Sequence, residues 1–214
     1  MQEQIKRFEE KVKELMSGEA TGHDWYHVKQ VRDMAIRIAE TEGGDLELIE
    51  LAALAHDVGD RKFYSSEEEG EQKTIELLKA SGIPTDVSDK VMDIVRKLSF
   101  KGAGVADDMP TLEGKIVQDA DRLYALGAMG IARTFAYGGA KGRPIFDPEI
   151  PVQQHASKDA YYGSKSSSIN HFYEKLLLLK DRINTKTAQE IAERRHAYME
   201  EFLKQFLAEW EAQD

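Results

Sequence analysis

Residues 51–57 read Leu-Ala-Ala-Leu-Ala-His-Asp, an apolar run that ends abruptly in a histidine and an acid. An uninterrupted apolar run of this kind is consistent with a buried helix. His56 closes this run and therefore points inward, and Asp57 follows it at once. An acid directly after a core segment is unfavourable unless it is paired or ligates a metal. The doublet therefore predicts a polar or metal-binding site at the end of a core helix.

The rest of the chain predicts further helices. Apolar residues recur at a spacing of three and four in residues 5–15, 28–38 and 87–98. Sustained alternation with a period of two, which is typical of a half-buried strand, is missing. A chain of 214 residues can bury a core without disulfides or a metal staple. We therefore expect an all-α fold in one compact domain that spans residues 1–214.

One segment, residues 137–168, departs from the helical pattern. It holds Gly138, Gly139, Gly142 and Gly163, three of the five prolines, and a Ser-Lys-Ser-Ser-Ser ending. Structureless loops longer than about 12 to 15 residues usually act as lids or are disordered insertions. We predict a flexible loop here, and the sequence leaves a lid and a spacer as open alternatives.

Composition excludes several classes of protein. The chain has 29 basic and 39 acidic residues and a formal net charge of -10, which repels phosphate backbones and argues against long nucleic acid as a partner. It has no cysteine, which excludes thiolate metal sites and suits a reducing compartment. No stretch approaches the roughly 20 apolar residues of a membrane span, and residues 1–15 lack the pattern of a signal peptide. We expect a cytoplasmic monomer or homodimer without a membrane partner.

A second histidine strengthens the prediction of a metal site. His27 shares the inward face of its helix with Val31 and Ile38. Taken alone, His27 is better explained as a hydrogen-bonded core histidine, and Asp57 as a helix-terminal or loop acid beside Gly59. Together with the acidic helix at 117–121, however, they supply two imidazoles and two carboxylates, most of a six-coordinate shell for a divalent transition metal.

Helical geometry leaves the second carboxylate undecided. Asp119 and Asp121 flank one apolar stripe on opposite sides, so that either can reach a metal.

The order His27, His56-Asp57 and Asp121 resembles that of the HD-domain metal-dependent phosphohydrolases, all-helical enzymes named for the doublet. The likeness extends to Thr-Gly-His-Asp-Trp-Tyr-His at 21–27, His-Asp-Val-Gly-Asp at 56–60, the segment 118–128 and the tail around 171–176. It covers nearly the whole chain. The chain looks closest to the small single-domain bacterial members, some of which are nucleotide pyrophosphohydrolases.

The resemblance implies a ligand set for the metal. It assigns one divalent ion to His27, His56, Asp57 and Asp121, and it leaves Asp119 to orient a histidine ligand. Subgroups with two metals carry extra histidines after the doublet, whereas no histidine lies from 58 to 154, so we expect one ion unless carboxylates alone hold a second. We expect Mn, with Mg, Fe, Co, Ni and Zn as alternatives. Tyr124 stands where close relatives are expected to carry an acid, which puts any role of an acid there in doubt.

Further charged residues near the motifs are candidates for catalysis and substrate binding, although surface roles remain open for them. We expect catalytic roles for Asp57, Asp60 and Lys62. Cationic side chains can bind phosphate groups. The candidates for substrate binding are His23, Arg61, Lys62, His171 and Lys175.

The expected substrate is a small phosphorylated molecule, most simply a nucleotide. The resemblance favours a pyrophosphohydrolase that converts a (d)NTP to the (d)NMP and pyrophosphate through a metal-activated water. The alternatives are a 5'-nucleotidase, an alarmone-type phosphohydrolase, which the lack of an added regulatory domain disfavours, and a metal- or nucleotide-binding module without turnover.

Overall fold

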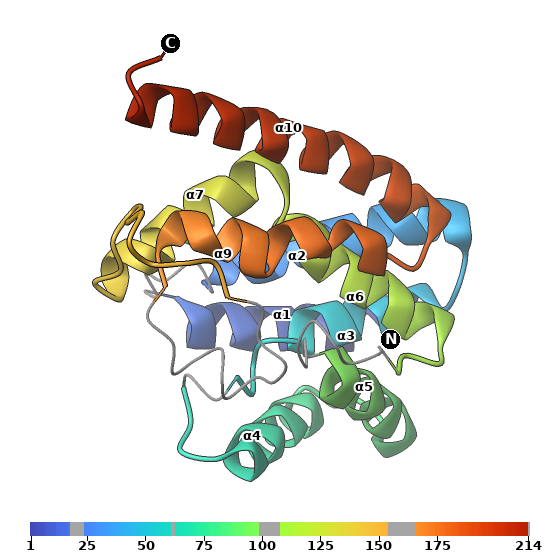
Figure 1. The fold of residues 1–214 in the computed structure, drawn as a ribbon. Helices are drawn as coiled ribbons and strands as arrows, with labels where there is room; N and C mark the ends of the chain where they lie inside the picture. The colour runs from blue at the N-terminus through green and yellow to red at the C-terminus, as the bar shows by residue number, and fades with distance from the viewer. Residues whose placement is uncertain (18–23, 61–62, 99–107, 154–165, 214) are drawn as a thin grey trace. The chain divides into compact units, whose positions relative to one another are not determined.

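The computed structural model describes residues 1–17, 24–60, 63–98, 108–153 and 166–213. Throughout these residues the regular secondary structure is helical and no strand occurs, which confirms the all-α fold (Figure 1). The described residues group into two compact units, one from 1–98 with 108–121 and one from 122–213. We call these unit 1 and unit 2. The expectation of a single domain over 1–214 stays a prediction.

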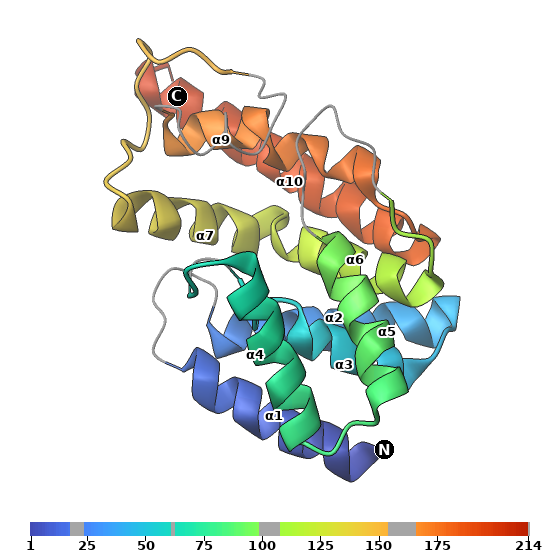
Figure 2. The same ribbon diagram turned by 90° about the horizontal axis from the view of Figure 1, so that it is seen from below.

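Unit 1 is built around one central helix. Its elements are α1 (Gln2–Met16), α2 (Trp25–Glu42), α3 (Leu46–Ala55), α4 (Glu67–Ala80), α5 (Thr85–Leu98) and most of α6 (Leu112–Tyr124). The helix α3 contacts α1, α2 and α5, and each of its residues from Ile49 to Ala55 is buried. The apolar run that ends in His56-Asp57 is thus the core helix of the unit. Figure 2 shows α4 and α5 side by side.

The helices α2 and α3 form a hairpin that positions the histidines. Their connection is short, and Gly43 and Gly44 adopt φ values of 84° and 98°, a backbone region that other residues rarely enter. Asp24 caps the start of α2 by accepting from the His27 N–H at 3.0 Å, and Asp45 caps the start of α3. Because the two helices run in opposite directions, the start of α2 and the end of α3 lie at the same, open end of the hairpin.

Unit 2 contains residues 122–124 of α6, then α7 (Gly127–Ala140), α9 (Ser168–Glu174), two 3-10 turns (Leu176–Leu178 and Lys180–Arg182) and α10 (Lys186–Trp210). An aromatic cluster of Phe135, Phe172 and Phe202 joins α7, α9 and α10, with ring centroids 5.8 to 6.1 Å apart. The Arg195 guanidinium of α10 also donates a hydrogen bond to the Leu123 carbonyl of α6. These contacts hold α10 on the unit.

The predicted loop at 137–168 is wrong at its start. The helix α7 continues through Tyr137 to Ala140, and the non-helical segment begins at Lys141. Gly138 lies close to α9, because a Cβ there would lie 2.2 Å from the Ser168 hydroxyl oxygen and would require this hydroxyl to rotate away. Residues 141–153 have no regular helix, as expected, whereas 154–165 lie outside the described residues. The flexibility of the loop stays a prediction.

Among the described helices, none combines the length and the apolar character that crossing a bilayer requires.

Candidate metal centre

His27 lies in the first turn of α2, directly above the Asp24 cap. Its side chain is almost fully buried, as are those of Val28 and Val31 on the same helix. The sequence pattern predicted this inward orientation. The cap and the apolar face together fix where the imidazole points.

His56 is the last residue of the α3 hairpin arm, at the C-cap position, and it retains helical backbone angles. Its Nδ1 lies 2.7 Å from the Ala53 carbonyl oxygen. A carbonyl only accepts, so Nδ1–H donates this bond and Nε2 of the neutral ring carries the lone pair. Val58 is fully buried and its N–H donates to the Ala55 carbonyl, which anchors the turn that carries Asp57.

Three side chains from these two helix ends face one another. The Nε2 atoms of His27 and His56 are 3.1 Å apart. Asp57 Oδ2 lies 3.2 Å from the Nε2 of His27 and 3.6 Å from that of His56. Ligands at right angles around an ion with bonds of about 2.1 Å stand roughly 3.0 Å apart. The spacing of His27, His56 and Asp57 therefore suits a single metal ion.

Asp121 of α6 approaches the same imidazoles from another helix. Its Oδ1 lies 3.6 Å from the Nε2 of His27 and 4.0 Å from the Nε2 of His56. Its side chain is 42% exposed, whereas Asp119 on the same helix is fully buried. Of the two acids that the sequence left open, Asp121 lies near both imidazoles, and its role as a ligand stays a prediction. The role of Asp119 in orienting a histidine stays a prediction.

The chemistry of the donor set fits a divalent cation. The Nε2 atom of His56 and the carboxylates of Asp57 and Asp121 are acceptors, so only the Nε2 atom of His27 can carry a proton while that ring is neutral. Several acceptors around one point repel one another, and a cation satisfies all of them at once. Mixed imidazole and carboxylate ligation is typical of divalent transition metals.

The other predicted residues near the doublet are only partly described. Asp60 lies in the turn after Asp57, is partly exposed and donates its backbone N–H to the Asp57 carbonyl at 3.2 Å. This hydrogen bond keeps the Asp60 backbone close to Asp57, one of the predicted ligands. His23, Arg61 and Lys62 lie outside the described residues, and their roles stay predictions.

His171 and Lys175 lie one helical turn apart in unit 2, where the Lys175 N–H donates to the His171 carbonyl at 3.0 Å. Burial, together with the positive charges of Lys175 and Arg143, lowers the pKa of His171 to about 3. His171 is therefore neutral near pH 7, which differs from the cation that the sequence suggested. Its imidazole can still donate a hydrogen bond to a phosphate.

Arg143 lies near His171, a proximity that the sequence does not predict. The Ser168 and Ile169 N–H groups donate to the Pro144 and Ile145 carbonyls, which brings the segment after Arg143 alongside the start of α9. No sequence motif indicates this proximity, because it depends on hydrogen bonds between residues that lie more than twenty positions apart in the chain.

Comparison with known proteins identifies the family of the chain. The model of the HD domain matches residues 24–126. The uncharacterized protein YpgQ of Bacillus subtilis is 40% identical over 195 residues, which cover 91% of this chain and 87% of YpgQ.

Three solved structures resemble the chain along almost its whole length. An HD-superfamily hydrolase from Bacillus thuringiensis is 47% identical with a TM-score of 0.76, and each chain is covered to 99%. A protein from Lactobacillus plantarum is 36% identical with a TM-score of 0.89 and the same coverage. The complex of Bacillus subtilis YpgQ with ADP is 36% identical with a TM-score of 0.76 and covers 98% of this chain and 100% of YpgQ. The chain therefore belongs to the HD-domain family and is a metal-dependent phosphohydrolase.

Proposed function

We propose that this hydrolase is a nucleotide pyrophosphohydrolase, which cleaves a (d)NTP to the (d)NMP and pyrophosphate. The observation that carries the proposal is the approach of two imidazole Nε2 atoms to each other and to two carboxylates, with imidazole–imidazole and imidazole–carboxylate distances of 3.1 to 4.0 Å, in a chain of the HD-domain family. We assign His27, His56, Asp57 and Asp121 as ligands of one ion, which we propose to be Mn. Four protein ligands would leave room on a six-coordinate ion for a water and a phosphate oxygen.

When bound, a divalent ion acidifies a water and polarises a phosphorus–oxygen bond. The chain's own residues hold and orient the reacting groups. We assign Asp60 as the acceptor of the water proton, because it is a partly exposed acid in the turn that carries Asp57. The water oxygen forms a bond to the α-phosphorus, the bond from this phosphorus to the bridging oxygen breaks, and pyrophosphate leaves with the bridging oxygen.

The nucleotide part of the proposal has two supports. The relative YpgQ was solved in complex with ADP. In unit 2 of this chain, Lys175 and Arg143 bring two positive charges close to neutral His171. Charge-assisted hydrogen bonds from such groups suit the outer phosphates of a nucleotide. We propose Lys175 and His171 for these phosphates, with His23, Arg61 and Lys62 as further contacts and Lys62 also as a catalytic residue.

The experiment that tests this function follows both the product and the oxygen atom. Metal-free protein is supplied with Mn or Mg and incubated with nucleoside mono-, di- and triphosphates in water enriched in ¹⁸O. We expect the triphosphates to give the monophosphate and pyrophosphate in equal amounts, with the label in the monophosphate, because attack at the α-phosphorus places the water oxygen there. The Asp57→Asn variant, which alters a proposed ligand, is the matched control and should give no product.

Other products assign other functions. A diphosphate with labelled inorganic phosphate indicates a γ-phosphatase, and release of phosphate from monophosphates indicates a 5'-nucleotidase. If an alarmone is supplied as substrate, release of its 3'-pyrophosphate indicates an alarmone-type phosphohydrolase. Binding of metal and nucleotide without any product indicates a binding module, and each of these results contradicts the proposal.

A further inference from the structure

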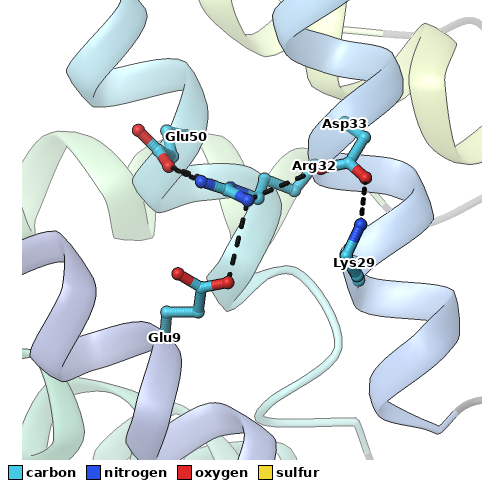
Figure 3. A network of polar contacts seen from close by, with 5 residues as sticks. All are labelled: Glu9, Lys29, Arg32, Asp33 and Glu50. Carbon is cyan, nitrogen blue, oxygen red and sulfur yellow. Dashed lines mark hydrogen bonds and ion pairs between the residues drawn. The ribbon is translucent and has the colours of Figure 1, made fainter.

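An ion pair joins the two helices that carry the histidines of the metal centre. The Arg32 guanidinium of α2 donates from Nε, at 2.8 Å, and from Nη2 to the same Oε1 of Glu50 on α3 (Figure 3). Both side chains are largely removed from water, with 22% of Arg32 and 11% of Glu50 exposed. Glu9 of α1 adds a second carboxylate at 3.7 Å from Nη1.

The surroundings keep this pair ionic. Burial alone lowers the pKa of Arg32, but the hydrogen bond and charge of Glu50, with the charges of Glu9 and Asp33, outweigh it and raise the pKa above its usual value. Lys29 in turn is paired with Asp33 on the same helix (Figure 3). Arg32 therefore stays protonated wherever the protein is folded.

The Arg32–Glu50 pair lies within the hairpin at a short distance from both histidines of the metal centre. Arg32 lies five residues after His27, and Glu50 lies six residues before His56. At 1.5 Å per helical residue these offsets are roughly 7.5 and 9 Å. Because α2 and α3 run in opposite directions, the pair bridges them at one level, between the connection and the open end where the imidazoles face each other.

The ion pair adds a directional contact to the apolar packing of this hairpin. The buried faces of both helices include alanines: Ala35, Ala39, Ala52 and Ala53. Hydrophobic burial has no preferred direction, whereas a guanidinium that donates twice to one carboxylate oxygen does. A slip of one residue moves one helix by about 1.5 Å. Such a slip is large beside the 3.1 Å that separates the two Nε2 atoms.

We propose that Arg32 and Glu50 are positioning residues, which hold the His27 and His56 Nε2 atoms at the separation that the metal requires. The inference rests on the proposed metal centre but not on the identity of the substrate. Neither residue belongs to the proposed ligand set. Their effect reaches it through the register of α2 against α3.

The competing explanation is that the pair only stabilises the fold. The two differ in a testable way, because replacing both partners of a buried ion pair by apolar residues is often neutral or stabilising, whereas removing one partner is destabilising. A purely stabilising pair should therefore be replaceable without any effect on metal binding. A positioning pair should not.

The test uses Arg32→Met, Glu50→Leu and the double variant, with Mn affinity measured by calorimetry and thermal unfolding measured without metal. We expect each single variant to unfold at lower temperature and the double variant to recover most of that loss. We expect Mn affinity of the double variant to remain about tenfold or more below that of the wild type, as for other residues that orient metal ligands. Arg32→Lys keeps the positive charge but loses the planar guanidinium that donates twice to Glu50. Its Mn affinity should also fall while the fold persists.

The control is the ion pair of Arg96 with Glu71, which joins α5 to α4 at 3.0 Å and involves none of the helices α2, α3 and α6. Arg96→Met with Glu71→Leu should leave Mn affinity unchanged. Wild-type Mn affinity in both the Arg32/Glu50 double variant and Arg32→Lys overturns the inference, as does an equal loss in the control pair. A wild-type chain that binds no Mn overturns the proposed metal centre itself, which is a separate result.

Discussion

Gly70 of α4 lies so close to Gly59 that neither residue can carry a side chain. A Cβ on Gly70 would stand 2.2 Å from the Gly59 carbonyl oxygen, and a Cβ on Gly59 would stand 2.7 Å from the Gly70 carbonyl oxygen. The obstacle is backbone in both directions, so no flexible side chain can move aside. Gly59 comes two residues after Asp57, and α4 therefore supports the turn that holds this proposed ligand.

Gly70→Ala should weaken metal binding through this contact. Alanine favours a helix over glycine by roughly 0.5–1 kcal/mol, so helix propensity alone predicts a gain in stability. The close contact predicts the opposite, because overpacking of this kind typically costs about 1–3 kcal/mol and forces the backbone to shift. We expect lower thermal stability and weaker Mn binding, measured by melting and by calorimetry.

Gly139→Ala is the matched control for this change. Gly139 is also a helical glycine, but a Cβ there meets no described atom within 4 Å. That variant should be neutral or more stable and should bind Mn like the wild type. If Gly70→Ala behaves in the same way as Gly139→Ala, the backbone contact does not constrain the turn.

Removing proposed ligands should abolish metal binding without unfolding the chain. His56→Ala and Asp57→Ala each remove a donor from a set whose members lie 3.1 to 3.6 Å apart. We expect the wild type to bind a single Mn ion per chain and both variants to lose it, while the helical circular dichroism persists. Unchanged metal content, measured by elemental analysis after dialysis, would exclude the substituted residue as a ligand.

The two acids of α6 provide a comparison within one helix. Asp121→Asn should lower Mn affinity, because its Oδ1 approaches both imidazoles. Asp119 is fully buried, so its replacement should act mainly on folding and only indirectly on the metal. Equal metal affinity of Asp121→Asn and the wild type would show that Asp121 does not coordinate the ion.

Much of the fold follows from the sequence because its signals are local. The spacing of apolar residues predicts the helices, and the continuous run at 51–55 predicts a core helix, which α3 is. The start of the loop was mispredicted because Gly138 and Gly139 are typical of loops. In the structure Gly138 instead permits a close contact with Ser168, thirty residues away, which no local signal reveals.

The sequence likewise predicts some features of the candidate site and not others. The His56-Asp57 doublet and His27 are recognisable because a polar residue on an apolar face is unusual in itself. The choice between Asp119 and Asp121 needs the rotation of α6, and the Arg32–Glu50 pair needs the register of the hairpin. The contact of Gly59 with Gly70 depends on where α4 packs. These features arise from tertiary packing, which the spacing of residues along the chain does not determine.

The stability of the protein should fall in mild acid because of His171. Its pKa in the fold is about 3, below the ordinary 6.5, owing to burial and to the charges of Lys175 and Arg143. As the pH falls below 6.5, the unfolded chain takes up a proton that the folded chain does not, so the stabilising contribution present above pH 6.5 is lost progressively down to about pH 3. From pH 7 to pH 5 the loss should be about 2 kcal/mol at most.

His171→Gln removes the titrating group and should flatten this dependence. The measurement is urea denaturation at pH 7 and pH 5 in the presence of a chelator, which keeps the metal ligands out of the comparison. If wild type and variant lose the same stability between the two pH values, the His171 side chain is not held neutral by its surroundings.

Lys175 should matter more for triphosphates than for monophosphates. If its ammonium contacts the outer phosphates, Lys175→Ala removes a charge-assisted hydrogen bond, which is worth about 1.5–3 kcal/mol and corresponds to roughly a tenfold to hundredfold loss. We expect kcat/KM for a triphosphate to fall by this factor, while the inhibition constant of the monophosphate product changes little. Arg143→Ala should act in the same direction, because Arg143 shares the surroundings of His171 with Lys175.

Lys141→Ala is the control for charge alone. Lys141 belongs to the same segment as Arg143 and is exposed, with its ammonium 5.8 Å from the centre of the Tyr137 ring. Its removal changes the net charge as Lys175→Ala does, but it should leave the ratio of triphosphate to monophosphate recognition unchanged. Equal losses in the Lys141 and Lys175 variants that disappear at high salt would indicate long-range attraction of the nucleotide. A loss confined to Lys175 and Arg143, and retained at high salt, would identify direct contacts with the phosphates.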